Sequence, residues 1–165
     1  MKIFVALGTQ PFPMDRILRE LDLLVQESPQ GVYDIFAQTG YSKYRPGNFS
    51  CQAFLSAQEY AQRIREADLL ITHAGAGTML SALSQQKRII VCPRKKKLRE
   101  HVDDHQQQLA RKFQEMGCIL VLDGQPLGEM IDRAMQHSFV PFRSAPSQLP
   151  QLLCEFSDIP VPQDL

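Results

Sequence analysis

The amino-acid sequence predicts an α/β fold in which helices cover both faces of a parallel sheet, and two observations lead to it. Short apolar runs alternate with longer segments of helical period along most of the 165 residues, which is the βαβ pattern. Most of these runs lack apolar/polar alternation, as expected of strands that are buried on both faces. The composition, 44% hydrophobic and 22% charged, is that of one globular domain. A domain of this size buries roughly 70% of the surface of its unfolded chain and needs no disulfide or metal to fold.

The expected strands and helices follow one another in regular order. The strands are residues 3–7, 32–37, 69–72, 89–92 and 119–122, with 51–55 as a weaker candidate. The helices are residues 14–26, 57–66, 78–84, 101–116 and 127–137. The first helix has an apolar stripe at helical spacing, and Gly117 is the expected stop of the fourth.

Regular patterning ends near residue 140, so we assign residues 1–140 to the domain and 141–165 to a C-terminal tail. Five prolines interrupt the tail and leave one short helical stretch at 151–156. Leu152, Leu153 and Phe156 would share an apolar face there. The tail is therefore a candidate segment for docking to a partner protein.

Charge and cysteine content exclude several classes of protein. The 18 basic and 18 acidic side chains cancel, whereas nucleic-acid binding needs an excess of Lys and Arg, so no nucleic-acid partner is expected. No apolar run approaches the ~20 residues that cross a bilayer, and the N-terminal run is too short for a signal peptide. Cys51, Cys92, Cys118 and Cys154 form no CxxC pair, and we expect reduced thiols in a cytosolic protein.

The segment that follows the expected strand 69–72 is the clearest candidate binding site. In an open parallel sheet, ligands bind outside the carboxyl ends of the strands, and His73 lies at such an end. Gly75, Ala76, Gly77 and Thr78 come next, and small residues let backbone N–H groups approach a ligand at a positively polarised helix start. A diphosphate is the expected ligand, although tight-turn packing alone also explains the glycines. The spacing matches neither a P-loop nor a full GxGxxG.

Two further loops leave strands at the same edge. Gly8 and Thr9 follow the first strand and, with Gln10, either cap the next helix or face the same crevice. Arg94 follows the strand 89–92 closely enough to bind phosphate oxygens in bidentate fashion. The basic residues 95–97 beyond it are those of a solvated loop.

Residues 101–106 carry a polar cluster with three interpretations. On one helix, His101 and His105 would share a face, which is a spacing found in zinc sites. Without a third well-spaced ligand, we expect no metal there. Asp104, His105 and Gln106 are also groups that select sugar hydroxyls. Helix capping by Asp103 or Asp104 is the structural alternative.

These segments together resemble the C-terminal, donor-binding domain of family 28 glycosyltransferases. The resemblance rests on residues 8–10, 67–78, 91–94 and 101–106 and extends over about residues 1–135. It is closest to the stand-alone subunits of split enzymes, the bacterial polysaccharide transferases and the eukaryotic dolichol-linked N-acetylglucosamine transferase. It implies a Rossmann-like domain that is one half of a GT-B fold, and the length fits one such half.

The resemblance also implies a binding mode. UDP-sugar would place its diphosphate at residues 75–78, in contact with His73, and its sugar near Asp104, His105 and Gln106. Neither a metal nor another cofactor is implied. Similar proteins often carry Glu three residues after the motif Thr, where it holds the ribose. Ser81 stands there in this chain, which favours the bacterial polysaccharide branch.

The predicted function is that of the UDP-sugar-binding subunit of a two-component inverting glycosyltransferase. A membrane-anchored, acceptor-binding partner would supply the general base and the lipid-linked acceptor for polysaccharide synthesis. The chain would be cytoplasmic and would reach the inner face of the membrane only through this partner. Two alternatives stay open: a non-catalytic interaction or regulatory module that keeps the fold, with Ser81 as its support, and a relative of the UDP-N-acetylglucosamine epimerases.

Overall fold

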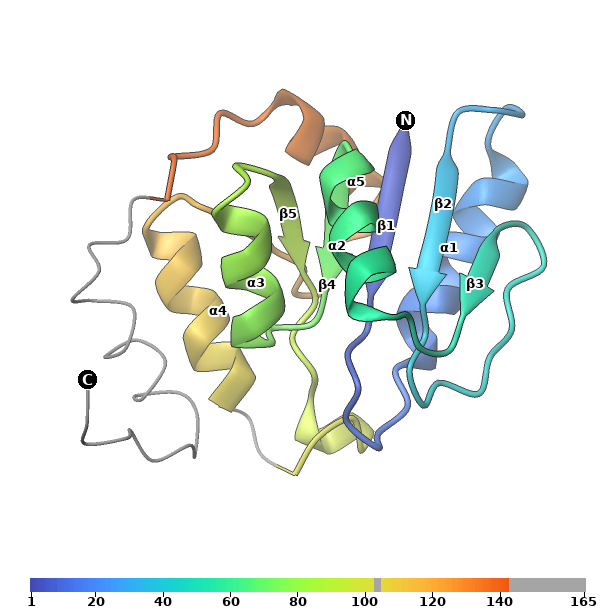
Figure 1. Cartoon of the computed structure of the whole chain (residues 1–165), viewed down its shortest axis with the longest axis horizontal. Helices are drawn as coiled ribbons and strands as arrows, with labels where there is room; N and C mark the ends of the chain where they lie inside the picture. Colours follow the sequence, from blue (N-terminus) through green and yellow to red (C-terminus); the bar gives the residue numbers. More distant parts are fainter. Residues whose placement is uncertain (103–104, 143–165) are drawn as a thin grey trace.

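Parallel strands form a single six-stranded sheet with the order β3-β2-β1-β4-β5-β6 in the computed structural model (Figure 1). The strands are β1 Lys2–Ala6, β2 Asp34–Gln38, β3 Ser50–Gln52, β4 Leu69–Thr72, β5 Arg88–Val91 and β6 Leu120–Val121. All neighbouring pairs are parallel, and this is the strand order of a Rossmann-like sheet. The structure describes residues 1–102 and 105–142. The predicted fold class is confirmed.

Helices cover both faces of the sheet. The helices α1 Asp15–Glu27 and α5 Leu127–Gln136 pack on one face, and α2 Ala57–Glu66, α3 Ala76–Leu83 and α4 His105–Glu115 pack on the other (Figure 1). Along β1, Ile3 and Val5 belong to the first core, whereas Phe4 and Ala6 belong to the second. Both sets are buried, which explains why the strand sequences are apolar without alternation.

The elements differ from the predictions mainly at their ends. The weak strand candidate 51–55 is present as the three-residue edge strand β3, and the 119–122 candidate is reduced to the two residues of β6. Both are edge strands with a single neighbour in the sheet. The helix α3 begins two residues earlier than predicted, and a 3₁₀ helix, η1 Lys96–Leu98, interrupts the basic loop.

The predicted helix 101–116 starts late, and this corrects one expectation. The helix α4 begins at His105, so His101 lies outside it and the two histidines do not share a helix face. Instead, the His101 ring lies against Phe12 of the loop after β1, with 5.9 Å between ring centroids. From Gln106 onward, where burial is described, the buried positions of α4 begin at Leu109, so burial of an apolar face does not require helix at 101.

The structure also bears on the predicted end of α4, the state of the cysteines, the C-terminal tail and the presence of membrane-spanning helices. Gly117 adopts a φ of +72° just after α4, as predicted for a helix stop. Cys92 and Cys118 are buried free thiols and Cys51 is partly buried, whereas Cys154 lies outside the described residues. Nearly all of the proposed docking tail, 141–165, is likewise outside them. Within the described ranges, none of the helices has the length and apolar character needed to span a bilayer.

Candidate functional site

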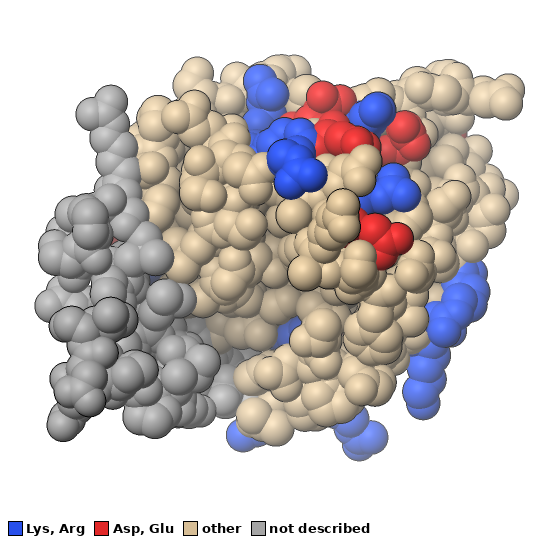
Figure 2. Space-filling view, in the orientation of Figure 1, with Lys and Arg blue, Asp and Glu red and all other residues tan. Residues whose placement is uncertain are grey.

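An open pocket of about 610 Å³ lies at the carboxyl ends of β1 and β4, and its size is that of a small-molecule site. It lies between the first turns of α2 and α3 and the loop after β1, in the lower half of the face drawn in Figure 2. Most residues predicted to bind substrate line it together: Gly8, Thr9, His73, Gly75, Ala76, Gly77, Thr78 and Ser81. The remaining lining residues are Gln10, Gln38, Leu55, Ala57, Tyr60 and Ala61.

The first turn of α3 presents its backbone N–H groups to this pocket. Gly75 is the N-cap residue, and no side chain caps the helix. The opening N–H groups of an α-helix have no partner within the helix, so they are free to donate to an anion. A Cβ atom added to Gly77 would meet no atom within 4 Å, which shows that the space in front of this turn is open.

The His73 side chain is enclosed between two glycines. A Cβ atom on either Gly8 or Gly75 would lie less than 3.0 Å from atoms of the imidazole, a separation that real Cβ atoms essentially never show. Gly8 also has a φ of +81°, a conformation that other residues adopt only with strain. These glycines are therefore required by the close approach of the histidine, whether or not a ligand binds.

The imidazole of His73 is neutral at physiological pH. It is 7% exposed, and burial together with the nearby Arg94 cation lowers its pKa to about 4, although a side-chain hydrogen bond with Gln106 opposes the shift. Its Nδ1 atom is buried and has no hydrogen-bond partner within the described chain. A buried polar atom without a partner is costly, and the residue that carries this one lines the pocket.

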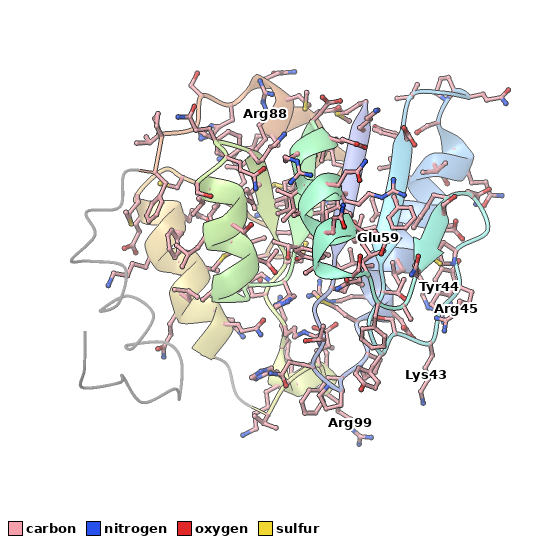
Figure 3. The ribbon with its side chains drawn as sticks, viewed as in Figure 1. Lys43, Tyr44, Arg45, Glu59, Arg88 and Arg99 are labelled. Atoms are coloured by element: carbon pink, nitrogen blue, oxygen red, sulfur yellow. The ribbon has the colours of Figure 1, made fainter. Side chains whose placement is uncertain are left out.

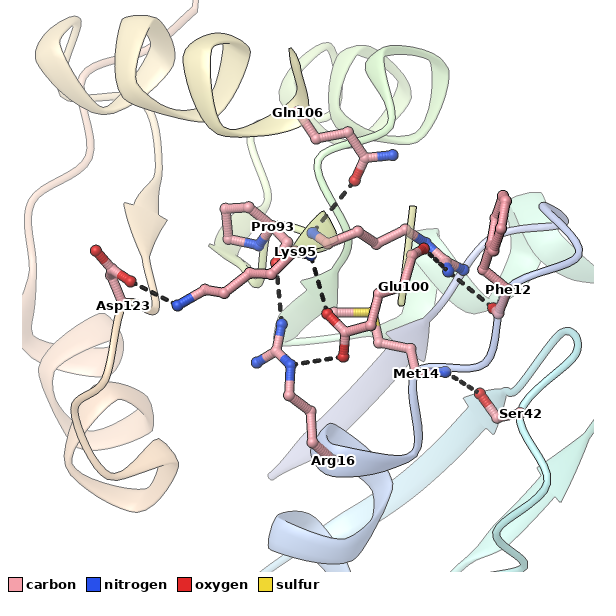
Figure 4. Close-up of polar contacts among 10 residues, drawn as sticks. Phe12, Met14, Arg16, Ser42, Pro93, Lys95, Glu100, Gln106 and Asp123 are labelled. Atoms are coloured by element: carbon pink, nitrogen blue, oxygen red, sulfur yellow. Dashed lines mark hydrogen bonds and ion pairs between the residues drawn. The ribbon is translucent and has the colours of Figure 1, made fainter. Parts of the chain in front are cut away.

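The structure does not place Arg94 at the surface, and this corrects the expectation of a direct phosphate contact. The side chain is 1% exposed, and its Nη1 and Nη2 atoms donate to backbone carbonyl oxygens (Figure 4). The rest of the basic loop is more accessible. Lys95 pairs with Asp123 at 2.8 Å, whereas Arg99 projects outward at the lower edge of the molecule, as does Lys43 (Figure 3).

The predicted sugar-binding cluster is only partly described. Gln106 contacts the pocket through its hydrogen bond with His73, and its Oε1 atom also accepts from the Arg94 backbone N–H at 3.4 Å (Figure 4). His105 is the first residue of α4, and Asp104 lies outside the described residues. Across the described ranges, the acidic, Cys and His side chains form no group of three that could hold a metal ion.

Sequence reasoning missed the wall of the pocket that α2 supplies. The Tyr60 hydroxyl lies 2.8 Å from Thr78 Oγ1, and burial raises the pKa of Tyr60. Gln38 is buried at the end of β2, where its Oε1 atom accepts from the Leu55 backbone N–H at 3.2 Å. The sequence signals for this wall were the weak strand candidate 51–55 followed by the helix 57–66, which together place the helix start at the carboxyl edge of the sheet, and the capping box that begins at Ser56.

Comparison with known protein families identifies the family of the domain that carries this pocket. The family model of the glycosyltransferase family 28 C-terminal domain matches residues 2–147. The chain belongs to this family. The predicted resemblance is therefore confirmed, and with it the prediction of a glycosyltransferase domain. The match also covers every predicted site residue.

Relatives and solved structures agree with this family. The "UDP-N-acetylglucosamine transferase subunit ALG13" of Eremothecium gossypii is 36% identical over 84 residues, which are 50% of this chain and 39% of the relative. The human protein of the same name is 30% identical over 121 residues, or 70% of this chain and 10% of the relative. The chain thus spans well under half the length of these two relatives.

The solved structures confirm the fold at low sequence identity. A solution structure of ALG13 superposes with a TM-score of 0.58 at 20% identity and covers 94% of each chain. The crystal structure of the glycotransferase of kitacinnamycin superposes with a TM-score of 0.63 at 16% identity, covering 92% of this chain but 36% of its own. The family 28 domain therefore matches about a third of that larger glycosyltransferase.

Proposed function

We propose that this family 28 domain binds the donor of a two-component inverting glycosyltransferase, and that the donor is a UDP-sugar. One observation carries the proposal. The neutral His73 and the uncapped start of α3 line one open pocket. The amides of α3 offer hydrogen bonds to an anion with several acceptor oxygens, and the neutral imidazole completes the wall beside them. The relatives' name makes UDP-N-acetylglucosamine the first sugar nucleotide to test.

In the proposed binding mode, the diphosphate accepts hydrogen bonds from the first turn of α3, residues 75–78. The wall beside it is formed by Leu55, Ala57, Tyr60 and Ala61 and is mostly apolar, which suits the flat face of the uracil base. The sugar then extends toward Gln106, on the other side of His73. Ser81 lies on the pocket side of α3 and offers a hydroxyl to the ribose.

The reaction that this arrangement supports is a single displacement. An acceptor hydroxyl oxygen attacks the anomeric carbon, the bond from that carbon to the β-phosphate oxygen breaks, and UDP leaves with the electron pair. The acceptor proton passes to a general base on the partner. The amides of α3 and the helix dipole stabilise the charge that develops on the leaving diphosphate, each charge-assisted hydrogen bond contributing roughly 1.5–3 kcal/mol. We propose that no metal or other cofactor takes part, so a chelator leaves UDP binding unchanged.

The partner in this proposal is a membrane-anchored protein that binds a lipid-linked acceptor for polysaccharide synthesis. The relatives' name, a transferase "subunit", supports a divided enzyme. The domain itself would lie at the cytoplasmic face of the membrane and contact it only through the partner. Co-expression with a candidate partner, followed by transfer of labelled sugar to membrane lipid, tests this part of the proposal.

Nucleotide binding is tested by calorimetric titration of the full chain with UDP. In Gly77→Ala, the new methyl group projects into the open space before α3, so UDP affinity should fall by about tenfold or more, the equivalent of ~1.4 kcal/mol. The same change replaces glycine within a helix and should raise the free energy of unfolding by roughly 0.5–1 kcal/mol. Loss of affinity with gain of stability separates a ligand effect from damage to the fold.

Gly47→Ala is the matched control, because Gly47 also has open space around its Cα atom but lies outside the pocket. Its UDP affinity should equal that of the unmodified protein. A chain that shows no heat of UDP binding, alone or with its partner, would contradict the proposal. An unchanged melting temperature in excess UDP would favour the non-catalytic alternative, because saturation at a hundred times Kd adds about 2.7 kcal/mol to the free energy of unfolding.

A further inference from the structure

Arg94 has the largest of the fully buried side chains among the described residues. The proposed binding mode gives it no contact with the ligand. It is 1% exposed, and arginine is rarely buried unless its charge is compensated. Across the described residues, the ion pairs join Arg16 to Glu100 and Lys95 to Asp123, and neither includes Arg94. A buried cation without a direct counter-ion needs another explanation.

The guanidinium of Arg94 joins two loops that are distant in the sequence. Its Nη2 atom donates to the Leu7 carbonyl at 2.6 Å. Its Nη1 atom donates to the carbonyls of Phe12 at 2.8 Å and Glu100 at 2.9 Å (Figure 4). Leu7 and Phe12 flank the pocket residues Gly8, Thr9 and Gln10, whereas Glu100 belongs to the loop after β5. One side chain therefore fixes both ends of the loop after β1.

The backbone of Arg94 makes a further link to the pocket. Its N–H donates to Gln106 Oε1, and Gln106 is hydrogen-bonded to His73. A second neighbour of the His73 ring is Gly8, which follows directly on the Leu7 carbonyl held by the guanidinium. Two neighbours of the imidazole, Gln106 and Gly8, are thus held by the same arginine, one through its backbone and one through its side chain.

Glu100, in the loop after β5, is itself held in place by hydrogen bonds. It is 4% exposed, and its carboxylate accepts from Arg16 Nε at 2.8 Å and from the Lys95 backbone N–H at 3.1 Å. Arg16 in turn donates to the Pro93 carbonyl at 2.9 Å. The loop after β5 is thereby tied to α1, so the carbonyls that receive the guanidinium do not move independently.

We propose that Arg94 is the positioning residue of the nucleotide pocket. It sets where Gly8 and Gln106 stand against His73 and places a fixed positive charge behind the imidazole, without touching the ligand. This inference rests on the proposed function, because it assumes that the pocket binds UDP. Lysine cannot take over this role, because three separate carbonyl oxygens are held by a planar fork that a single ammonium group does not reproduce.

The experiment compares Arg94→Lys and Arg94→Met with the unmodified protein, at a temperature well below the melting temperature of each. The readouts are UDP affinity by calorimetry and the ¹⁵N signals of the His73 ring by NMR without nucleotide. Both variants should bind UDP about tenfold more weakly or worse, the loss expected from roughly one charge-assisted hydrogen bond. The His73 ring signals should shift in both, because its neighbours move.

Lys97→Met is the matched control, since it removes an exposed cation from the same loop. Its UDP affinity should stay within twofold, and the His73 signals should not move. If Arg94→Met does not fold, Arg94→Lys decides the test. Arg94→Ala should in addition regain UDP affinity when guanidinium ion, but not sodium, is added at concentrations that leave the unmodified protein folded.

Two outcomes would overturn the inference. One is a folded Arg94→Lys that binds UDP within twofold of the unmodified protein. The other is a loss of affinity while the His73 signals stay unchanged, which would mean that Arg94 acts without positioning this ring. If the unmodified protein itself does not bind UDP, the proposed function fails, but the NMR comparison still reports whether Arg94 sets the position of His73.

Discussion

Two loops at the same edge of the sheet are built in opposite ways. In the loop after β2, residues 40–48, Asp22 of α1 satisfies the polar groups. Its carboxylate accepts from the Tyr44 hydroxyl at 2.6 Å and from the backbone N–H groups of Gly47 at 3.1 Å and Asn48 at 2.8 Å. In the loop after β4, by contrast, no side chain caps α3 and His73 Nδ1 has no partner within the described chain.

The difference separates structural polar groups from those available to a ligand. A buried donor or acceptor without a partner costs about 1–3 kcal/mol, and among the described residues His73 Nδ1 and Arg94 Nε are left in this state. The polar groups of the loop after β2 find their partner in Asp22 of α1, and Arg19 of the same helix also lies over the Tyr44 ring at 4.3 Å. The loop after β4 leaves the start of α3 uncapped, and the following changes test this contrast.

The largest effect is expected from Gly8→Ala. The new Cβ would collide with the His73 ring, and alanine would have to adopt the positive φ of this position. Overpacking costs about 1–3 kcal/mol and the left-handed conformation about 1–2 kcal/mol, so the free energy of unfolding should fall by roughly 3 kcal/mol or more in urea titrations. Combined with His73→Ala, the same change should cost clearly less, because the colliding ring is gone. Additive costs would show that the glycine is not there for the histidine.

The next effect concerns pH and depends on His73. In the unfolded chain its pKa is close to 6.5, whereas in the folded protein it is about 4. As the pH falls between these values, the unfolded chain binds the proton first, so this histidine lowers the free energy of unfolding by about 3 kcal/mol in total. Thermal unfolding measured from pH 7 to pH 4 should therefore show a steeper acid loss than in His73→Asn. Equal slopes would contradict the buried neutral imidazole, and His137→Asn is the matched control.

A smaller effect is expected from Asp22→Asn. Burial raises the pKa of Asp22, but hydrogen bonds from Tyr44, Gly47 and Asn48 outweigh it and hold the pKa below its usual value. The carboxylate thus contributes stability above about pH 4 that is lost as the pH falls further. The amide should lower the free energy of unfolding by about 2 kcal/mol near pH 7 and leave UDP affinity unchanged. Asp132→Asn, on the exposed surface of α5, is the control for the loss of one negative charge. An altered UDP affinity in Asp22→Asn would contradict the purely structural role of the loop after β2.

Much of the fold follows from the sequence pattern, because burial on both faces of a strand leaves a continuous apolar run. The strands β1, β4 and β5 lie within a residue of their predicted positions for this reason. The start of α4 could not be predicted in the same way. His101 has helical spacing to His105, but it lies outside the helix, and its ring lies against Phe12, a contact between residues far apart in the chain that no local pattern reports.

The residues of the candidate site likewise divide into those that local sequence patterns predicted and those that they did not. His73 and residues 75–78 were predictable, because a buried strand that ends in histidine and glycines is a local pattern. Tyr60 was not, because its contact with Thr78 joins two helices and has no local signature. Arg94 was placed in the right loop but given the wrong surroundings, since its distance from the strand end says nothing about which carbonyls lie around it.

The chain order of apolar and polar residues was enough to determine the parallel sheet, its helices and the strand end at which the candidate pocket lies. Only the three-dimensional packing decided which cation faces solvent, which is enclosed, and which polar atoms stay without a partner. The reason is physical: periodicity reports on each residue's own burial, whereas the partner of a buried charge or donor comes from another part of the chain.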